Sequence, residues 1–252
     1  VIVLAAIFGY AARGLRFATF CIGVFAYIIV AGYWDKTAVT LSLVAVAVPL
    51  SILTGLFVGI LASRSRTVHR AIAPLLDLMQ TVPTFAYLIP ILVLFGIGPV
   101  VGVIASAIYA VPPMVHNVIL GLRRVDKEVI DSARMSGSTD RQLLWLVMVP
   151  AAMSTILIGV NQTIMASLSM VVIASMVGGV DDIGIEVFQS MKQAKFGESL
   201  LSGLVIALIA IVLDRASRGL AGKILDTKSR RHGSALWIGA AFLVALFQGL
   251  AH

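Results

Sequence analysis

Long apolar stretches dominate the chain, and short polar segments separate them. A helix needs about 20 mostly apolar residues to cross the hydrocarbon core of a bilayer, because unpaired backbone groups are costly in lipid. The long stretches are Phe17 to Tyr33, Ala38 to Ala62, the proline-interrupted Ile72 to Phe95, Pro99 to Val118, Thr155 to Val177, Leu200 to Leu213 and Ala235 to Leu250. The shorter stretch Val1 to Ala12 has the pattern of the tail of a helix whose start precedes the chain. We therefore expect an all-α, polytopic helical membrane protein with about seven to eight apolar segments.

The composition excludes an ordinary soluble globular domain. Of the 252 residues, 60% are hydrophobic and only 12% are charged, and the mean hydropathy is +1.03; soluble domains carry about twice that share of charge. The one cysteine, Cys21, lies in an apolar stretch and has no partner in the chain for a disulfide. Cysteine content therefore indicates nothing about the redox compartment.

The basic residues predict an orientation. If the chain alternates across the membrane, one side receives 2, 3, 5 and 6 of the 19 Lys and Arg residues, in the segments 11–16, 63–70, 119–142 and 214–233. The other side receives Lys36, Lys192 and Lys195. Cytoplasmic loops of membrane proteins carry this kind of excess. The net charge of +7 therefore indicates topology and contact with anionic membrane lipid, and we expect no nucleic-acid partner.

The longest cytoplasmic loop runs from Leu122 to Pro150, and we call it the coupling loop. Asp126 is placed to cap a first helix over Lys127 to Ser136, and Gly137 suits a left-handed helix stop. Thr139 and Gln142 have the spacing of a capping box for a second helix, which would run to Pro150. The pattern thus predicts two helices joined by a tight turn.

The coupling loop resembles a known motif. It reads Asp131-Ser132-Ala133, three residues, Gly137, nine residues, and then Val147, Met148, Val149 and Pro150. This spacing is similar to the EAA loop of importer permeases of the ATP-binding cassette superfamily, which reads Glu-Ala-Ala, three residues, Gly, nine residues, Ile, any residue, Leu, Pro. The departures are conservative: Asp for Glu, Ser for the first Ala, and Val for Ile and Leu.

Other segments extend the resemblance to the glycine betaine, proline and choline importers over roughly 37–215. They are 74–83, 87–90, 94–98, 159–163, 168–176 and 211–215. The stretch 178–184 is more acidic and less glycine-rich than in that class. The resemblance implies three parts: N-terminal membrane helices in 1–36, a core permease domain in 37–215 that contains the coupling loop 122–150, and a basic cytoplasmic segment with a C-terminal membrane helix in 216–252.

The resemblance also implies partners and a location. The chain would be a transporter subunit in the inner membrane of a prokaryote, paired with a second copy of itself and served by an extracytoplasmic solute-binding protein. ATP and magnesium would bind to separate ATPase subunits, and this chain would hold no cofactor. No G-x-x-x-x-G-K-[ST] phosphate cradle occurs in it. The residues we expect to couple to the ATPase are Glu128, Asp131, Ser132, Ala133, Arg134, Gly137, Arg141 and Pro150.

A solute path is expected along the span from Gly159 to Met176. Its polar or polarisable candidates are Asn161, Gln162, Ser169 and Met170, and Pro83 marks a break in another span that either lines the path or is a simple kink. Quaternary ammonium groups are usually held by aromatic faces, which this span lacks, so specificity is expected to lie in a separate binding protein. The segment 178–198 has helical spacing and predicts a short outer helix, either a docking or gating element or an ordinary connection.

Two G-x-x-x-G steps, at Gly55 with Gly59 and at Gly98 with Gly102, predict close helix contacts.

Three alternative functions fit parts of the sequence less well than an importer permease. A DNA-binding helix-turn-helix fits the coupling loop loosely, but this loop has a net charge of only +1 and is held between two spans. An intramembrane enzyme lacks the H-E-x-x-H and G-x-S-x-G motifs. An ion-coupled secondary transporter normally needs charged residues inside its spans, and these are scarce here.

Overall fold

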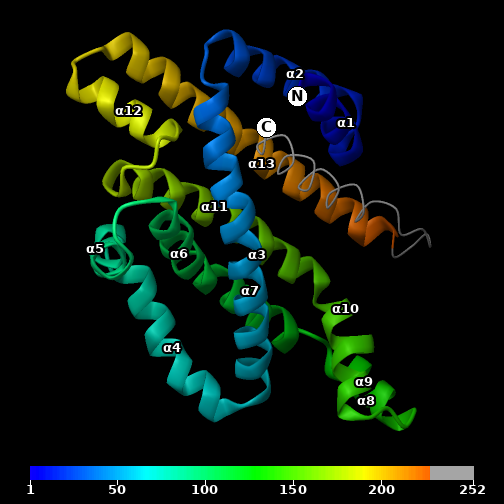
Figure 1. Cartoon of the computed structure of the whole chain (residues 1–252). Helices are drawn as coiled ribbons and strands as arrows, with labels where there is room; N and C mark the ends of the chain where they lie inside the picture. The colour runs from blue at the N-terminus through cyan, green and yellow to red at the C-terminus, as the bar shows by residue number, and fades with distance from the viewer. Residues whose placement is uncertain (228–252) are drawn as a thin grey trace.

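The computed structural model describes residues 1–227, and within that range the chain is helical and contains no strand (Figure 1). The apolar stretch 235–250, predicted as a final span, lies outside the described residues. The helices are α1 Ile2–Arg13, α2 Leu15–Val30, α3 Trp34–Arg64, α4 Arg66–Thr81, α5 Thr84–Phe95, α6 Pro99–Tyr109, α7 Val111–Arg123, α8 Lys127–Met135, α9 Asp140–Gln142, the π-helix Leu143–Met148, α10 Val149–Ala151, α11 Met153–Gly178, α12 Ile183–Lys192 and α13 Phe196–Thr227.

Four helical segments in residues 1–227 are long and apolar enough to cross a membrane. They are α3, the pair α6 and α7 over Pro99–Arg123, α11, and Phe196–Leu225 of α13. The pair α4 and α5 adds a fifth if it counts as one span, although it is bent by 98°. The described residues therefore contain four or five spans, beside the two shorter apolar helices α1 and α2. This number does not confirm the expected seven to eight apolar segments, of which 235–250 lies outside the described residues.

Helices α1 and α2 are apolar but too short to count as spans. Helices α1 and α2 contain 12 and 16 residues, which at 1.5 Å per residue gives about 18 Å and 24 Å, short of the roughly 30 Å of hydrocarbon. Hydropathy shows that both helices are apolar, but neither is long enough to cross the hydrocarbon core. The expected domain boundaries after residues 36 and 215 both fall inside continuous helices, α3 and α13.

The centre of the bundle is the crossing of α3 with α7. A Cβ atom added to Gly55 would lie 2.6 Å from Cβ of Met114, and one added to Gly59 would lie 2.6 Å from Cβ of Val118. No side chain fits between the two helices at these points. The first predicted G-x-x-x-G step is thus a true close contact. The second is not, because a Cβ atom at Gly102 meets its nearest neighbour only at 3.8 Å.

The two ends of the bundle carry different elements. Figure 1 shows α12 at one end and α8 with α9 at the other, with α3 and α11 running between them. The short helix predicted within 178–198 is therefore present as α12, at the end opposite the coupling loop. Helix α1 packs against α13 on the side of the bundle, where a Cβ atom at Gly219 would lie 2.6 Å from the carbonyl oxygen of Ala12.

We expect Gly59→Ala to lower the stability of the protein. The added methyl group overlaps Val118 and must push α7 away from α3, which costs about 1–3 kcal/mol in a packed interior. Chemical unfolding of the purified chain in detergent, followed by circular dichroism, measures the effect. Gly23→Ala is the control, because no heavy atom lies within 4 Å of the added Cβ there. Equal losses in both variants would contradict this account of the contact.

Candidate functional site

The coupling loop folds as two short helical pieces around a glycine turn. Gly137 has φ +77°, the left-handed conformation predicted for it. The capping box is also present: the amide of Gln142 donates to Oγ1 of Thr139 at 3.4 Å, and the amide of Thr139 donates to Oε1 of Gln142 at 2.9 Å. Asp126 occupies the N-cap position of α8, but its side chain makes no capping bond. The predicted role of that carboxylate as a cap is therefore wrong.

The second helical piece differs from the expected helix. It contains a single α-turn, α9, followed by the π-helix Leu143–Met148 and then α10. Pro150 is the second residue of α10 and has no N–H, so it cannot continue the regular hydrogen-bond ladder of the preceding turn. π-Helices are rare and occur mostly as single-turn bulges within α-helices, frequently at functional sites. The buried side chains Leu143 and Leu144 of this π-helix anchor the loop to the bundle.

The coupling loop is fixed to the ends of the spans. Leu144 belongs to the same buried cluster as Met114 and Leu122 of α7 and Ile156 of α11. Nη2 of Arg64, the last residue of α3, donates to the carbonyl oxygen of Asp140 at 3.1 Å. The loop is thus attached to three spans at once, so a force on it reaches the bundle.

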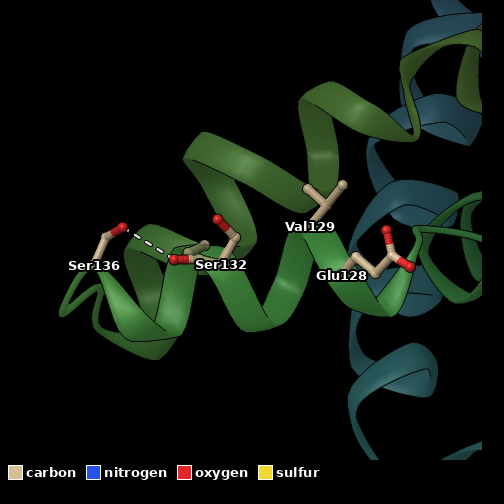
Figure 2. Close-up of a pocket in the computed structure, with 5 residues that line it drawn as sticks. Glu128, Val129, Ser132 and Ser136 are labelled. Atoms are coloured by element: carbon tan, nitrogen blue, oxygen red, sulfur yellow. Dashed lines mark hydrogen bonds between the residues drawn. The ribbon is translucent and has the colours of Figure 1, made fainter.

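A shallow hollow of about 440 Å³, widely open to solvent, lies along one face of α8, and we call it the groove. Its lining residues are Glu128, Val129, Ser132, Ala133 and Ser136, and Figure 2 shows them along one side of this helix. The hydroxyl of Ser136 donates to the carbonyl oxygen of Ser132 at 3.0 Å, so it is held against the helix. The groove therefore has a mixed apolar and hydroxyl wall, with a carboxylate at one end.

The structure brings together only some of the predicted coupling residues. Three of them, Glu128, Ser132 and Ala133, line the groove. Other predicted residues do not line it: Asp131, Arg134, Gly137 and Arg141 are exposed elsewhere on the loop, and Pro150 is half-buried in α10. Val129 and Ser136 line the groove but were not predicted from the motif. They lie three and four residues from Ser132, a spacing that places all three on one face of a helix.

The predicted path residues divide between two sides of α11. Gln162 and Ser169 are exposed and lie seven residues apart, on the same face. Asn161 instead points toward α13, where its amide donates to Asp214 at 3.1 Å and its carbonyl oxygen accepts from Ser217. Met170 is fully buried in the cluster that contains Leu88 and Val101. These two side chains therefore do not share the exposed face of Gln162. Pro83, also predicted, is exposed at the bend between α4 and α5.

A polar cluster fixes α12 at the end of the bundle opposite the coupling loop. Lys36, at the start of α3, forms ion pairs with Glu186 and, at 3.4 Å, with Asp181. The carboxylate of Asp182 is fully buried; it accepts from Thr40 Oγ1 at 3.1 Å and from the amide of Gly184 at 2.8 Å. Burial raises the pKa of Asp182, while hydrogen bonds from hydroxyl and amide groups oppose the shift. Sequence reasoning noted these acidic residues but not their shared partners on α3.

Comparison with known proteins identifies the family. Residues 51–228 match the family described as the binding-protein-dependent transport system inner membrane component. The chain belongs to this family. The resemblance inferred from the coupling loop and its flanking segments is therefore confirmed, and the loop lies within the matched range.

Two relatives illustrate this family. The chain is 44% identical over 204 residues to the glycine betaine transport system permease protein OpuAB of Bacillus subtilis (strain 168), covering 81% of this chain and 70% of that protein. It is 41% identical over 247 residues to the trimethylamine N-oxide transport system permease protein TmoV of Pelagibacter ubique (strain HTCC1062), covering 96% of this chain and 34% of that protein. This inner membrane component thus spans about one third of the length of TmoV.

A solved structure supports the fold. A chain of the MetNI methionine ABC transporter, solved in an inward-facing conformation, aligns with a TM-score of 0.68 at 17% identity, covering 79% of this chain and 97% of that chain. At this identity the likeness shows the fold alone.

We expect Asp182→Ala to lower the free energy of unfolding by about 1–3 kcal/mol, because the buried hydroxyl of Thr40 and the first amides of α12 lose their acceptor. Chemical unfolding in detergent measures this loss. Asp35→Ala is the matched control, since Asp35 is an exposed carboxylate one residue from the Lys36 cluster. A loss for Asp35→Ala as large as that for Asp182→Ala would contradict the role assigned to the buried carboxylate.

Proposed function

We propose that this chain is the membrane-spanning permease subunit of an ATP-driven importer for a small quaternary amine or related compatible solute, such as glycine betaine, choline, proline or an amine oxide. One observation carries the proposal: the family-specific loop presents an open groove along α8, and the same loop is anchored to α3, α7 and α11. A groove held by three spans is suited to receive a partner and to transmit its movement. The names of the relatives supply the solute class.

The groove is the proposed seat of a separate ATPase subunit. ATP and magnesium would bind to that subunit, and this permease would contribute no bond chemistry. With a second copy of the permease, two grooves would engage two ATPase subunits. Closure of the ATPase pair on ATP would draw the two α8 helices together, and the buried anchor of the loop would tilt the spans. Such a device works if two packings of the bundle differ by only a few kcal/mol.

The solute would arrive from an extracytoplasmic binding protein at the end that carries α12. In this assembly, the exposed face of α11 with Gln162 and Ser169 is the proposed path lining. Asn161 and Met170 serve instead to hold α11 against its neighbours. The proposed location is the inner membrane of a prokaryote, with the basic segments in the cytoplasm and in contact with anionic lipid.

An ion-coupled secondary transporter is the alternative from a different class. Such a mechanism needs titratable groups inside the spans that bind and release the ion. In α3, in the pair α6 and α7 and in α11, Asp, Glu, Lys and Arg occur only at the ends, as Arg64 of α3 and Arg123 of α7 illustrate. Asp214 of α13 lies further inside its span, where it forms an ion pair with Arg218 at 2.9 Å. Family membership also favours an importer driven by a separate ATPase.

The groove can be tested by filling it. In Ala133→Phe a ring occupies the space where an ATPase segment would sit, and we expect at least about tenfold weaker retention of the ATPase, equivalent to about 1.4 kcal/mol. Copurification of the tagged permease from native membranes in mild detergent, with ATP-dependent solute uptake in the same cells, measures this.

Met135→Phe is the matched control for the groove. It also adds a ring to α8, but Met135 is 84% exposed and does not line the groove. Both variants should reach the membrane in normal amounts. Normal ATPase retention and uptake in Ala133→Phe, or equal losses in the two variants, would contradict docking in this groove.

A further inference from the structure

Four polar side chains form a continuous row across three helices at membrane depth. Nε2 of Gln80 on α4 lies 3.1 Å from Nδ1 of His116 on α7. The next residue of α7, Asn117, donates from Nδ2 to Oε1 of Gln162 on α11 at 2.8 Å. We call Gln80, His116, Asn117 and Gln162 the polar row. His116, Asn117 and Gln162 lie within segments long and apolar enough to cross a membrane, and Gln80 lies near the bend of the pair α4 and α5.

The polar row is not covered by the rest of the described chain. Gln80 and Gln162 are exposed, and His116 and Asn117 are half-buried. Amide and imidazole groups that face hydrocarbon lose their hydrogen bonds to water, which is strongly unfavourable. Apolar residues fill the exposed face of α3, where Leu53 is 64% exposed. The contrast indicates that α3 faces lipid and that the polar row faces water.

The hydrogen bonds leave a defined set of free donors. With the amide orientations of this structure, Gln80 donates to Nδ1 of His116, so the imidazole proton resides on Nε2. That N–H has no hydrogen-bond partner among residues 1–227. Asn117 uses its amide N–H groups on Gln162 and on the carbonyl oxygen of Pro113, at 2.8 Å each. The N–H groups of Gln162 therefore remain free as well.

We propose that the polar row is a wall of the solute pathway, and that its free N–H groups bind the oxygen of a zwitterionic solute, either a carboxylate or an amine oxide. This inference rests on the function proposed above. The wall presents no fixed positive charge, so it does not repel the quaternary ammonium end of such a solute. Neutral donors also hold the oxygen weakly, which suits a site of passage. A second copy of the permease supplies the opposite wall.

The depth of the polar row places it in the cytoplasmic half of the membrane. Gln162 is nine residues from the start of α11 at Met153, about 14 Å along the helix. Leu53 is eleven residues from the cytoplasmic end of α3 at Arg64, about 17 Å along that helix. Gln162 and Leu53 therefore lie at a similar depth in the membrane. The proposal places water around Gln162 and lipid around Leu53.

Cysteine accessibility tests whether the polar row faces water. In a Cys21→Ala background, single cysteines are placed at Gln80, at Gln162 and, as the lipid-facing control, at Leu53. A charged, membrane-impermeant thiol reagent is added to inside-out membrane vesicles that contain the complete transporter, and modification is followed by mass spectrometry. We expect Gln80→Cys and Gln162→Cys to react about tenfold faster than Leu53→Cys, because the reactive thiolate forms in water and is disfavoured in hydrocarbon.

The same variants separate this inference from the proposed function. ATP-dependent uptake by cells carrying the Cys21→Ala parent tests the importer itself. If that parent transports solute and both row cysteines react as slowly as Leu53→Cys, the proposal that the polar row lines the pathway is wrong. The proposed importer function is not contradicted by this result. Fast reaction of the row cysteines supports the wall, whatever drives transport.

A second comparison tests the role of the His116 donor. His116→Leu removes the N–H and should lower the maximal uptake rate about fivefold, the effect of one lost hydrogen bond, without changing the half-saturating solute concentration set by the binding protein. His116→Gln keeps an N–H donor, so we expect a smaller decrease in its maximal uptake rate. Equal maximal rates in the parent and in His116→Leu would overturn solute binding by this row.

Discussion

The close contact between α3 and α7 governs the position of every functional element in this permease. Gly55 and Gly59 remove two side chains from α3, and α7 fills the space with Met114 and Val118. In a membrane, apolar surfaces gain little by leaving lipid, so association depends on close packing of this kind. The contact therefore defines where α7 runs, and α7 carries His116 and Asn117 and leads directly into the coupling loop.

This arrangement connects the two ends of the molecule. At one end, the buried Leu144 ties the coupling loop to α7 and α11, and Arg64 ties it to α3. At the other end, the ion pairs of Lys36 and the buried carboxylate of Asp182 hold α12 on the start of the same α3. Helix α3 is continuous between the two anchors. A displacement of the coupling loop can thus reach α12 through one continuous helix.

The sequence predicted local features well and long-range ones poorly. The turn at Gly137 and the capping box at Thr139 depend on neighbouring residues, so spacing alone revealed them. Hydropathy located the apolar segments but did not fix the number of spans, because it does not distinguish a short apolar helix such as α2 from one that crosses the bilayer. The partners of Asn161 on α13 and of His116 on α4 lie 53 and 36 residues away. Only the folded chain brings them together, which is why Asn161 was assigned to the path and His116 was not.

The central claim, that a separate ATPase seats in the groove of α8, is tested most directly by site-specific photo-crosslinking. A photoreactive amino acid replaces Ser132 in the groove or Gln189 on α12, and the transporter is irradiated in native membranes. The account predicts a crosslink between position 132 and an ATPase subunit, and none to that subunit from position 189. An ATPase crosslink from position 189, or none from position 132 while ATP-dependent uptake persists, would contradict it.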